Sequence, residues 1–147
     1  MKPIEGYNKL RGGYYTPKKI AEFIATWAIR TKNDEILEPS CGDGSFISAI
    51  ADRLHEMGAS DQSIKHNVTG VELDKVEASK ASQYGPNVVQ SDFFTYYQKC
   101  IDGEKEFDVI VGNPPFIRYQ NFEEEYRKVA FELMTKHGFQ PNRLMNI

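Results

Sequence analysis

The sequence predicts an α/β fold in which helices cover a doubly wound, mostly parallel sheet. Short apolar stretches alternate with stretches of helical periodicity along most of the 147 residues, an order typical of parallel sheets. Each apolar stretch also runs directly into a short and distinctive loop. The four strands that we expect are residues 35–38, 67–73, 87–90 and 107–111.

The first helix is expected after residues 1–13, a polar segment that we interpret as an N-terminal arm. Thr16 is a suitable N-cap residue, and Pro17 suits the first position of a helix. The following apolar residues recur at the spacing of one helical face. They are Ile20, Phe23, Ile24 and Trp27. This pattern predicts a helix with one apolar face that ends at residues 31–34.

The first two predicted strands each lead into a helix. After the first strand, a tight turn should give way to a helix near Ser45, with Ile47, Ile50, Leu54 and Met57 on one face. Gly58 stands where a left-handed residue commonly closes a helix. After the second strand, Asp74 can cap a helix that residues 85–86 (Gly-Pro) end.

The last two strands differ in character. Residues 87–90 form a short third strand. Residues 107–111 (FDVIV) are mostly apolar, as expected of a central strand that is covered on both faces. A final helix is expected over residues 119–137, closed by Gly138.

Composition limits the classes of function. The chain is 40% hydrophobic and 27% charged, with 18 basic and 21 acidic residues and a net charge of −3, which argues against a strongly basic nucleic-acid grip. Cys41 and Cys100 make no disulfide framework, and no His/Cys cluster has the spacing of a metal site. Without a signal peptide or an apolar membrane span, a cytoplasmic protein is expected.

The four loops after the strands are the most distinctive parts of the sequence. They comprise residues 39–44, 72–74, 91–94 and 112–116. In a parallel sheet with right-handed crossovers, all four lie at one edge, where ligands bind at the switch in strand order. We therefore expect one site built from these loops.

The first three loops carry groups that suit a nucleoside. Gly42 and Gly44 permit positive φ and a close approach of a ligand, although a plain tight turn explains them equally well. Glu72 can accept hydrogen bonds from ribose hydroxyls, the alternative being a helix-capping acid. Asp92 can accept from an adenine amino group beside the ring of Phe93, the alternative being a turn Asp with core aromatics.

The fourth loop, Asn113-Pro114-Pro115-Phe116, points to an amino group as target. The prolines hold the loop rigid, and the Asn113 side chain offers a carbonyl acceptor beside the backbone carbonyls. Two acceptors can hold both hydrogens of an NH₂ group while Phe116 stacks on its ring. They also stabilise the positive charge that grows on nitrogen during attack, so no acid–base pair is required.

Five segments together resemble a known family. They are Gly13-Tyr14-Tyr15-Thr16-Pro17, Glu38-Pro39-Ser40-Cys41-Gly42-Asp43-Gly44-Ser45-Phe46, Gly70-Val71-Glu72-Leu73-Asp74, Ser91-Asp92-Phe93-Phe94 and Gly112-Asn113-Pro114-Pro115-Phe116. In this order they resemble motifs X, I, II, III and IV of gamma-class N6-adenine DNA methyltransferases, a class that includes fused type IIG restriction–modification enzymes. The resemblance covers roughly residues 12–120.

The resemblance implies a Rossmann-like fold that binds S-adenosyl-L-methionine (SAM), truncated here after the fourth strand and its helix. The residues implied to contact SAM are Tyr15, Thr16, Pro17, Glu38, Pro39, Ser40, Cys41, Gly42, Gly44, Phe46, Glu72, Leu73, Asp92 and Phe93. Those implied to hold a target adenine flipped out of duplex DNA are Asn113, Pro114, Pro115 and Phe116. Phe116 replaces the Tyr often found there, which keeps the stacking surface.

The family pattern continues beyond the length of this chain. We therefore expect residues 14–147 to be a partial catalytic domain that lacks the later strands and the target-recognition domain, and to be too short for methyl transfer alone. The fourth strand would then present an open edge through which two copies could pair.

Two other functions fit the same loops. An RNA methyltransferase, or one that acts on a protein glutamine amide, could use the Asn-Pro-Pro-aromatic loop. A non-catalytic SAM-binding module is also consistent with the sequence. A nicotinamide oxidoreductase fits less well, because residues 39–44 lack the third glycine of the dinucleotide fingerprint.

Overall fold

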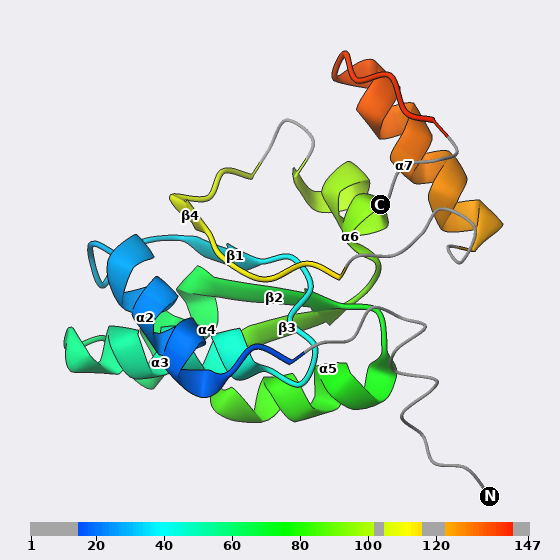
Figure 1. The fold of residues 1–147 in the computed structure, drawn as a ribbon. Coiled ribbons are helices and arrows are strands. Elements are labelled where there is room, and N and C mark those ends of the chain that lie inside the picture. The colour runs from blue at the N-terminus through cyan, green and yellow to red at the C-terminus, as the bar shows by residue number, and fades with distance from the viewer. Residues whose placement is uncertain (1–14, 102–104, 116–122, 143–147) are drawn as a thin grey trace, which may run out of the picture.

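The computed structural model describes residues 15–101, 105–115 and 123–142. Four parallel strands form one sheet in the order β3-β2-β1-β4, and Figure 1 shows helices on both faces of it. The strands are β1 (Ile36–Glu38), β2 (Val68–Glu72), β3 (Asn87–Gln90) and β4 (Val109–Ile110). The doubly wound parallel sheet predicted from the sequence is therefore confirmed.

The helices occupy the connections between the strands. They are α2 (Lys18–Ala28), α3 (Ser45–Glu56), α4 (Asp61–Asn67), α5 (Lys75–Ala81) with the short turn η1 (Ser82–Tyr84), α6 (Phe93–Tyr96), which continues into η2 (Tyr97–Ile101), and α7 (Glu124–Lys136). Helix α4 was missed, because six polar residues and one apolar residue, the buried Ile64, carry no helical periodicity. Residues 116–122, where the last helix was predicted to begin, lie outside the described residues.

The sheet separates two apolar cores. One core joins α2, α3 and α4 to the sheet and includes Ile36 and Val68. The other lies under α6 and includes Leu37, Val71 and Tyr96. Neighbouring residues of one strand thus face opposite cores, which explains why β1 is buried at every position.

Local signals set several element ends as predicted. The Asp74 side chain accepts from the backbone N–H groups of Val76 and Glu77 at 2.8 and 3.2 Å and caps α5. Gly58 and Gly138 follow α3 and α7 with φ of +82° and +84°. Both glycines occupy the left-handed region that closes a helix.

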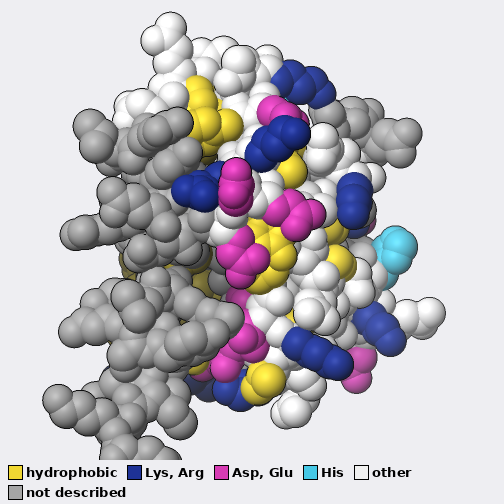
Figure 2. Space-filling view, turned by 90° about the vertical axis from the view of Figure 1, so that its right-hand side faces the viewer, with side chains coloured by type: hydrophobic (Ala, Val, Ile, Leu, Met, Phe, Trp, Pro, Cys, Tyr) yellow, Lys and Arg dark blue, Asp and Glu magenta, His cyan; other side chains and the backbone are white. Residues whose placement is uncertain are grey.

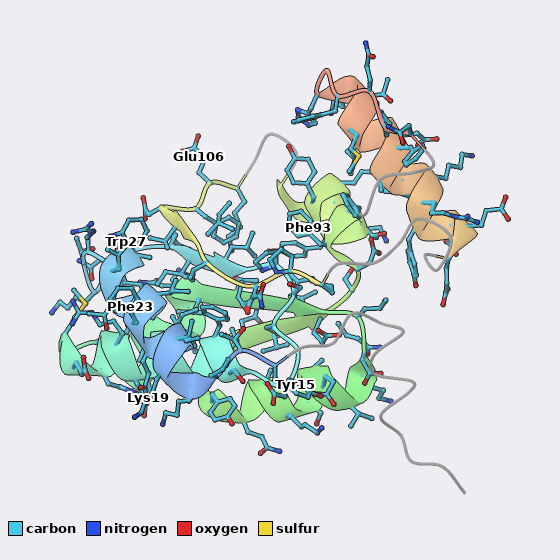
Figure 3. All side chains as sticks on the ribbon, viewed as in Figure 1. Tyr15, Lys19, Phe23, Trp27, Phe93 and Glu106 are labelled. Carbon is cyan, nitrogen blue, oxygen red and sulfur yellow. The ribbon has the colours of Figure 1, made fainter. Side chains whose placement is uncertain are left out.

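The prediction for the first helix was wrong about its N-cap, which is Pro17 and not Thr16. Helix α2 also packs on α3 through its small residues Ala21 and Ala25, while Phe23 and Trp27 are 72% and 67% exposed. Figure 3 shows these two aromatic side chains on α2. The periodicity was read correctly as helical, but of the predicted face Ile20, Phe23 and Trp27 are exposed while Ile24 packs partly against the core. The alanines allow the two helices to approach closely.

Strand β4 also differs from the prediction. It was expected to be central and covered on both faces, but it comprises two residues at the edge of the described sheet. Its Ile110 side chain is 65% exposed. The open edge expected at this strand is therefore present among the described residues. None of the helices in these residues is long and apolar enough to cross a membrane.

Candidate active site

The candidate site lies where the strand order reverses, between β1 and β4. Chain connections leave β1 toward β2 on one side, while β4 pairs with β1 on the other. Backbone hydrogen bonds join the neighbouring loops to the strands. The Cys41 N–H donates to the Val71 carbonyl at 2.9 Å, and the Ser91 N–H donates to the Glu72 carbonyl at 3.0 Å. All four predicted loops thus meet at the carboxyl ends of the parallel strands, where ligands bind in such folds.

A small pocket opens at this reversal. It is lined by residues from the segment before α2, the first loop and the start of the fourth loop: Tyr15, Thr16, Glu38, Ser40, Cys41, Gly42, Asp43, Ser45, Phe46 and Asn113. Eight of these ten were predicted from the sequence. No Lys or Arg is among these lining residues, so the pocket suits a cationic group. Figure 2 shows a group of Asp and Glu side chains near the middle of the face that it views.

Two residues far apart in the sequence meet at the mouth of this pocket. Asn113 follows β4, and its Nδ2 donates to Oγ1 of Thr16 at 3.3 Å. Thr16 lies one residue before Pro17, the N-cap of α2, so its hydroxyl makes this contact and does not cap the helix. With Nδ2 engaged as a donor, Oδ1 is the atom that Asn113 offers as an acceptor to another group.

The two glycines of the first loop have different structural roles. Gly42 has φ of +52°, and a Cβ built there meets nothing within 4 Å, so a ligand can approach its backbone. Gly44 has φ of +94°, and a Cβ there would lie 2.8 Å from the Cα of Ala81. Gly44 therefore lets α3 begin against α5, and it does not line the pocket.

Asp43 and Ser45 line the pocket but were not among the predicted site residues. Oδ1 of Asp43 accepts from the backbone N–H of Ser45 at 3.2 Å and from its hydroxyl at 2.9 Å. This hydrogen-bonded turn braces the loop ahead of α3. An Asp side chain often bonds the backbone two residues later, so the sequence Asp43-Gly44-Ser45 could have predicted this turn.

Glu72 joins the first two loops. Its Oε2 accepts from the Gly42 N–H at 2.9 Å, and its Oε1 accepts from the Asp74 N–H at 2.7 Å. Each carboxylate oxygen has a second acceptor position, so these bonds orient the group and leave it capacity for hydroxyls. The alternative to ribose binding was that Glu72 caps the next helix, but α5 is capped by Asp74.

Glu38 is the buried acid of the site. It ends β1 and is 1% exposed, and its Oε1 accepts from the Ser40 N–H at 3.1 Å. Burial raises the pKa of Glu38 to about 8, the Ser40 hydrogen bond opposes this shift, and the nearby Glu72 adds to it. The pKa rises because burial removes the carboxylate from water and so disfavours its charged form.

The remaining predicted residues, Glu72 among them, are absent from the pocket lining. Asp92 is buried and caps α6 by accepting from the Thr95 N–H at 2.9 Å. The Phe93 ring packs edge to face on Phe94, with 5.9 Å between the centroids. Pro17, Pro39, Leu73, Pro114 and Pro115 are likewise absent from the pocket lining. Phe116 lies outside the described residues.

Sequence comparisons show which family the chain belongs to. Residues 4–146 match the N-6 DNA methylase family. The chain is 33% identical over 117 residues to the type II methyltransferase M.HincII of Haemophilus influenzae, covering 80% of this chain and 19% of that protein. It is 32% identical over 114 residues to the modification methylase CviBIII of Paramecium bursaria Chlorella virus NC1A, covering 73% of this chain and 26% of that protein. The chain thus spans about a fifth to a quarter of these relatives.

Solved structures share the fold. The chain superposes on a DrdV–DNA complex with a TM-score of 0.66 and 18% identity, covering 97% of this chain and 19% of that one. A structure of a type I R-M system gives a TM-score of 0.60 at 22% identity, and the match covers 78% of this chain and 27% of that one. A class I SAM-dependent methyltransferase from Listeria monocytogenes gives a TM-score of 0.61 at 17% identity, covering 92% and 40%. The fold is thus the Rossmann-like fold of SAM-dependent methyltransferases. The match over residues 4–146 shows that this chain belongs to the N-6 DNA methylase family.

Proposed function

We propose that this chain is part of the catalytic domain of a site-specific methyltransferase that transfers a methyl group from SAM to adenine N6 in DNA. The observation that carries the proposal is the position of Asn113, which lines the same pocket as the glycine loop after β1. Residues 14–147 would form the partial domain, preceded by the arm over residues 1–13. The proposal includes a cytoplasmic location, where duplex DNA is the substrate.

The chemistry of the pocket fits SAM. Its lining offers the acids Glu38 and Asp43 and no basic residue, and Oγ of Ser40 is buried without a hydrogen-bond partner among the described residues. Such a lining suits the ammonium and sulfonium charges of SAM, and Thr16 and residues 38–44 would hold its methionine part. When bound, SAM supplies a methyl group activated by the sulfonium charge.

The other two loops would hold the nucleoside part of the cofactor. Glu72 is already oriented by two backbone N–H groups and would accept from the ribose hydroxyls. Asp92, with Phe93 beside it, would take the cofactor adenine. Both assignments are supported by the convergence of the strand ends, since Ser91 is hydrogen-bonded to the Glu72 carbonyl.

Asn113 would orient the amino group that receives the methyl. Its Oδ1 accepts one hydrogen and the Pro114 carbonyl accepts the other, while Pro115 keeps the loop rigid and Phe116 stacks on the target base. Two acceptors stabilise the charge that develops on the nitrogen. The adenine reaches this point by leaving the duplex, and other parts of the protein would supply most of the grip on DNA.

The test uses the protein that carries this chain at its full length. Incubation with labelled SAM and duplex DNA, RNA or a release-factor protein should place label on DNA alone, as N6-methyladenine in mass spectrometry. Asn113→Ala should lower the rate on the order of 100-fold. Asn33→Ala, an exposed asparagine at the opposite end of β1, should leave it unchanged. Label confined to RNA or to the protein substrate would refute the DNA assignment.

Two further parts of the proposal concern residues 1–147 by themselves. We propose that this segment cannot transfer methyl groups alone, because it matches only a fraction of its relatives. We also propose that copies of the isolated segment pair through the edge of β4, where Ile110 is exposed. An unpaired strand edge is a ready template for another strand.

A further inference from the structure

The Glu38 carboxyl lies between two parts of the pocket. It is buried at the end of β1, between β2 and β4. A Cβ built on Gly112 would overlap Oε1 of Glu38, so the carboxyl rests directly on the backbone that precedes Asn113. The same carboxyl lines the pocket beside Ser40, whose buried Oγ has no partner within the described part of the chain.

Within residues 15–101, 105–115 and 123–142, the ionisable groups near Glu38 include no Lys, Arg or His. They are Glu72 on β2, Cys41 and Asp43 in the first loop, and Tyr15 before α2, while the β4 side contributes the uncharged Val111 and Gly112. Burial, and then the charges of Glu38 and Glu72, also raise the pKa of the Cys41 thiol. Among the described residues, Glu72 is the charged group that raises the pKa of Glu38, and a cation that enters the pocket would favour the carboxylate instead.

We propose that Glu38 is a positioning residue that gives up a proton when the cationic end of SAM enters the pocket, and that its contact with Gly112 passes this change to Asn113. The inference rests on the function proposed above. The step is a simple exchange: the O–H bond of the neutral Glu38 acid breaks, the proton leaves to the buffer, and the carboxylate pairs with the entering positive charge.

The pH range follows from the pKa of Glu38. With a value of about 8 in the free protein, most molecules hold the proton near pH 7. An entering cation lowers that pKa, so binding near pH 7 should release close to one proton. Because release accompanies binding, SAM affinity should rise between pH 6 and pH 7, by at most about tenfold per pH unit. The ligand's own α-amino group has an ordinary pKa of about 7.7–8.0, so it stays largely protonated over this range and does not obscure the effect.

The experiment is calorimetry of SAM binding to the full-length protein in buffers with different heats of ionisation. Wild type should release nearly one proton per SAM near pH 7, whereas Glu38→Gln should release none and lose the pH dependence of affinity. Glu106→Gln removes an exposed carboxylate remote from the pocket (Figure 3) and should behave as wild type. Equal proton release by Glu38→Gln and wild type would overturn the inference.

A second measurement covers the case in which Glu38→Gln fails to fold. Wild-type protein with ¹³C-labelled glutamate carboxyls should show one neutral carboxylic acid signal near pH 7 that becomes a carboxylate on addition of SAM. An unchanged signal would overturn the inference. If wild type binds no SAM at any pH, the proposed function itself fails, which distinguishes the two outcomes.

The contact with Gly112 has its own test. Gly112→Ala places a methyl group where Oε1 of Glu38 lies and should lower both the proton release and the turnover number in DNA methylation. Gly138→Ala, at a glycine with open space around it, should change neither. Proton release and turnover at wild-type levels in Gly112→Ala would show that the contact carries no coupling.

Discussion

At the residue scale, the hydrogen bond between Thr16 and Asn113 ties the segment before α2 to the loop after β4. The bond is 3.3 Å long and exposed, so it adds little to stability, at most about 1 kcal/mol. Its effect should fall on the orientation of the Asn113 amide. We therefore expect substitutions of Thr16 to affect the proposed methyl transfer more than folding.

The matching prediction concerns Thr16→Val in the full-length protein. Loss of the acceptor should lower the turnover number on the order of tenfold, because the amide is free to rotate, while the melting temperature stays nearly constant. Thr16→Ser keeps the hydroxyl and should retain most of the activity. Steady-state kinetics with thermal denaturation measure both quantities, and an equal loss of activity in the two variants would contradict the assigned role of the hydroxyl.

A second residue-scale prediction follows from the buried acid Glu38. Its pKa is about 8 in the folded chain against an ordinary value of 4.5, so folding takes up a proton between these pH values. The stability contributed by the neutral acid is complete below about pH 4.5 and is lost as pH rises through about 8. Wild type should thus lose a few kcal/mol over this range relative to Glu38→Gln, measured by urea unfolding. Parallel pH curves for the two proteins would refute it.

Much of the pocket could be predicted from the sequence, because its residues stand directly after strands. Gly42 and Asn113 were predicted in this way, Glu38 was implied by the family resemblance, and the structure brings the three together. The roles of the glycines could not be predicted, since a motif does not show what surrounds a Cα. Gly44 was assigned to the ligand but serves the contact of α3 with α5.

At the scale of elements, Gly44 and Gly58 flank α3 and form a natural pair for comparison. Both have positive φ, but only at Gly44 would a Cβ meet the neighbouring helix, 2.8 Å from the Cα of Ala81. Gly58→Ala should cost about 1 kcal/mol for the left-handed backbone. Gly44→Ala should cost about 3 kcal/mol or more, because α5 must shift. Equal losses in chemical unfolding would contradict the close approach.

The orientation of α2 and the length of β4 could not be predicted for a shared physical reason. Periodicity shows that an element has two unlike faces, but the partner decides which face is buried. Ala21 and Ala25 face α3 because small residues permit close packing, and Phe23 and Trp27 of α2 are left exposed. The apolar residues 107–111 indicated a covered strand, yet its place in the sheet depends on segments other than the strand itself.

At the scale of the whole molecule, the exposed edge of β4 predicts the behaviour of the isolated segment. Residues 1–147 should form dimers through this edge, detected as a doubled mass in light scattering. Ile110→Lys should shift the mass toward one chain, since charge on an edge strand opposes pairing. Val76→Lys changes a comparably exposed residue on α5 and should leave the dimer intact. A wild-type mass of one chain would refute the pairing.

The acidic lining of the pocket has a consequence for selection among metabolites. ATP and NAD carry the same adenosine as SAM but have phosphates where SAM has its methionine part, and these negative charges would face Asp43 with no lysine or arginine among the described lining residues. Like charges brought close in a site of low polarity repel strongly. We therefore expect the pocket to select against abundant nucleotides by the sign of their charge as well as by their shape.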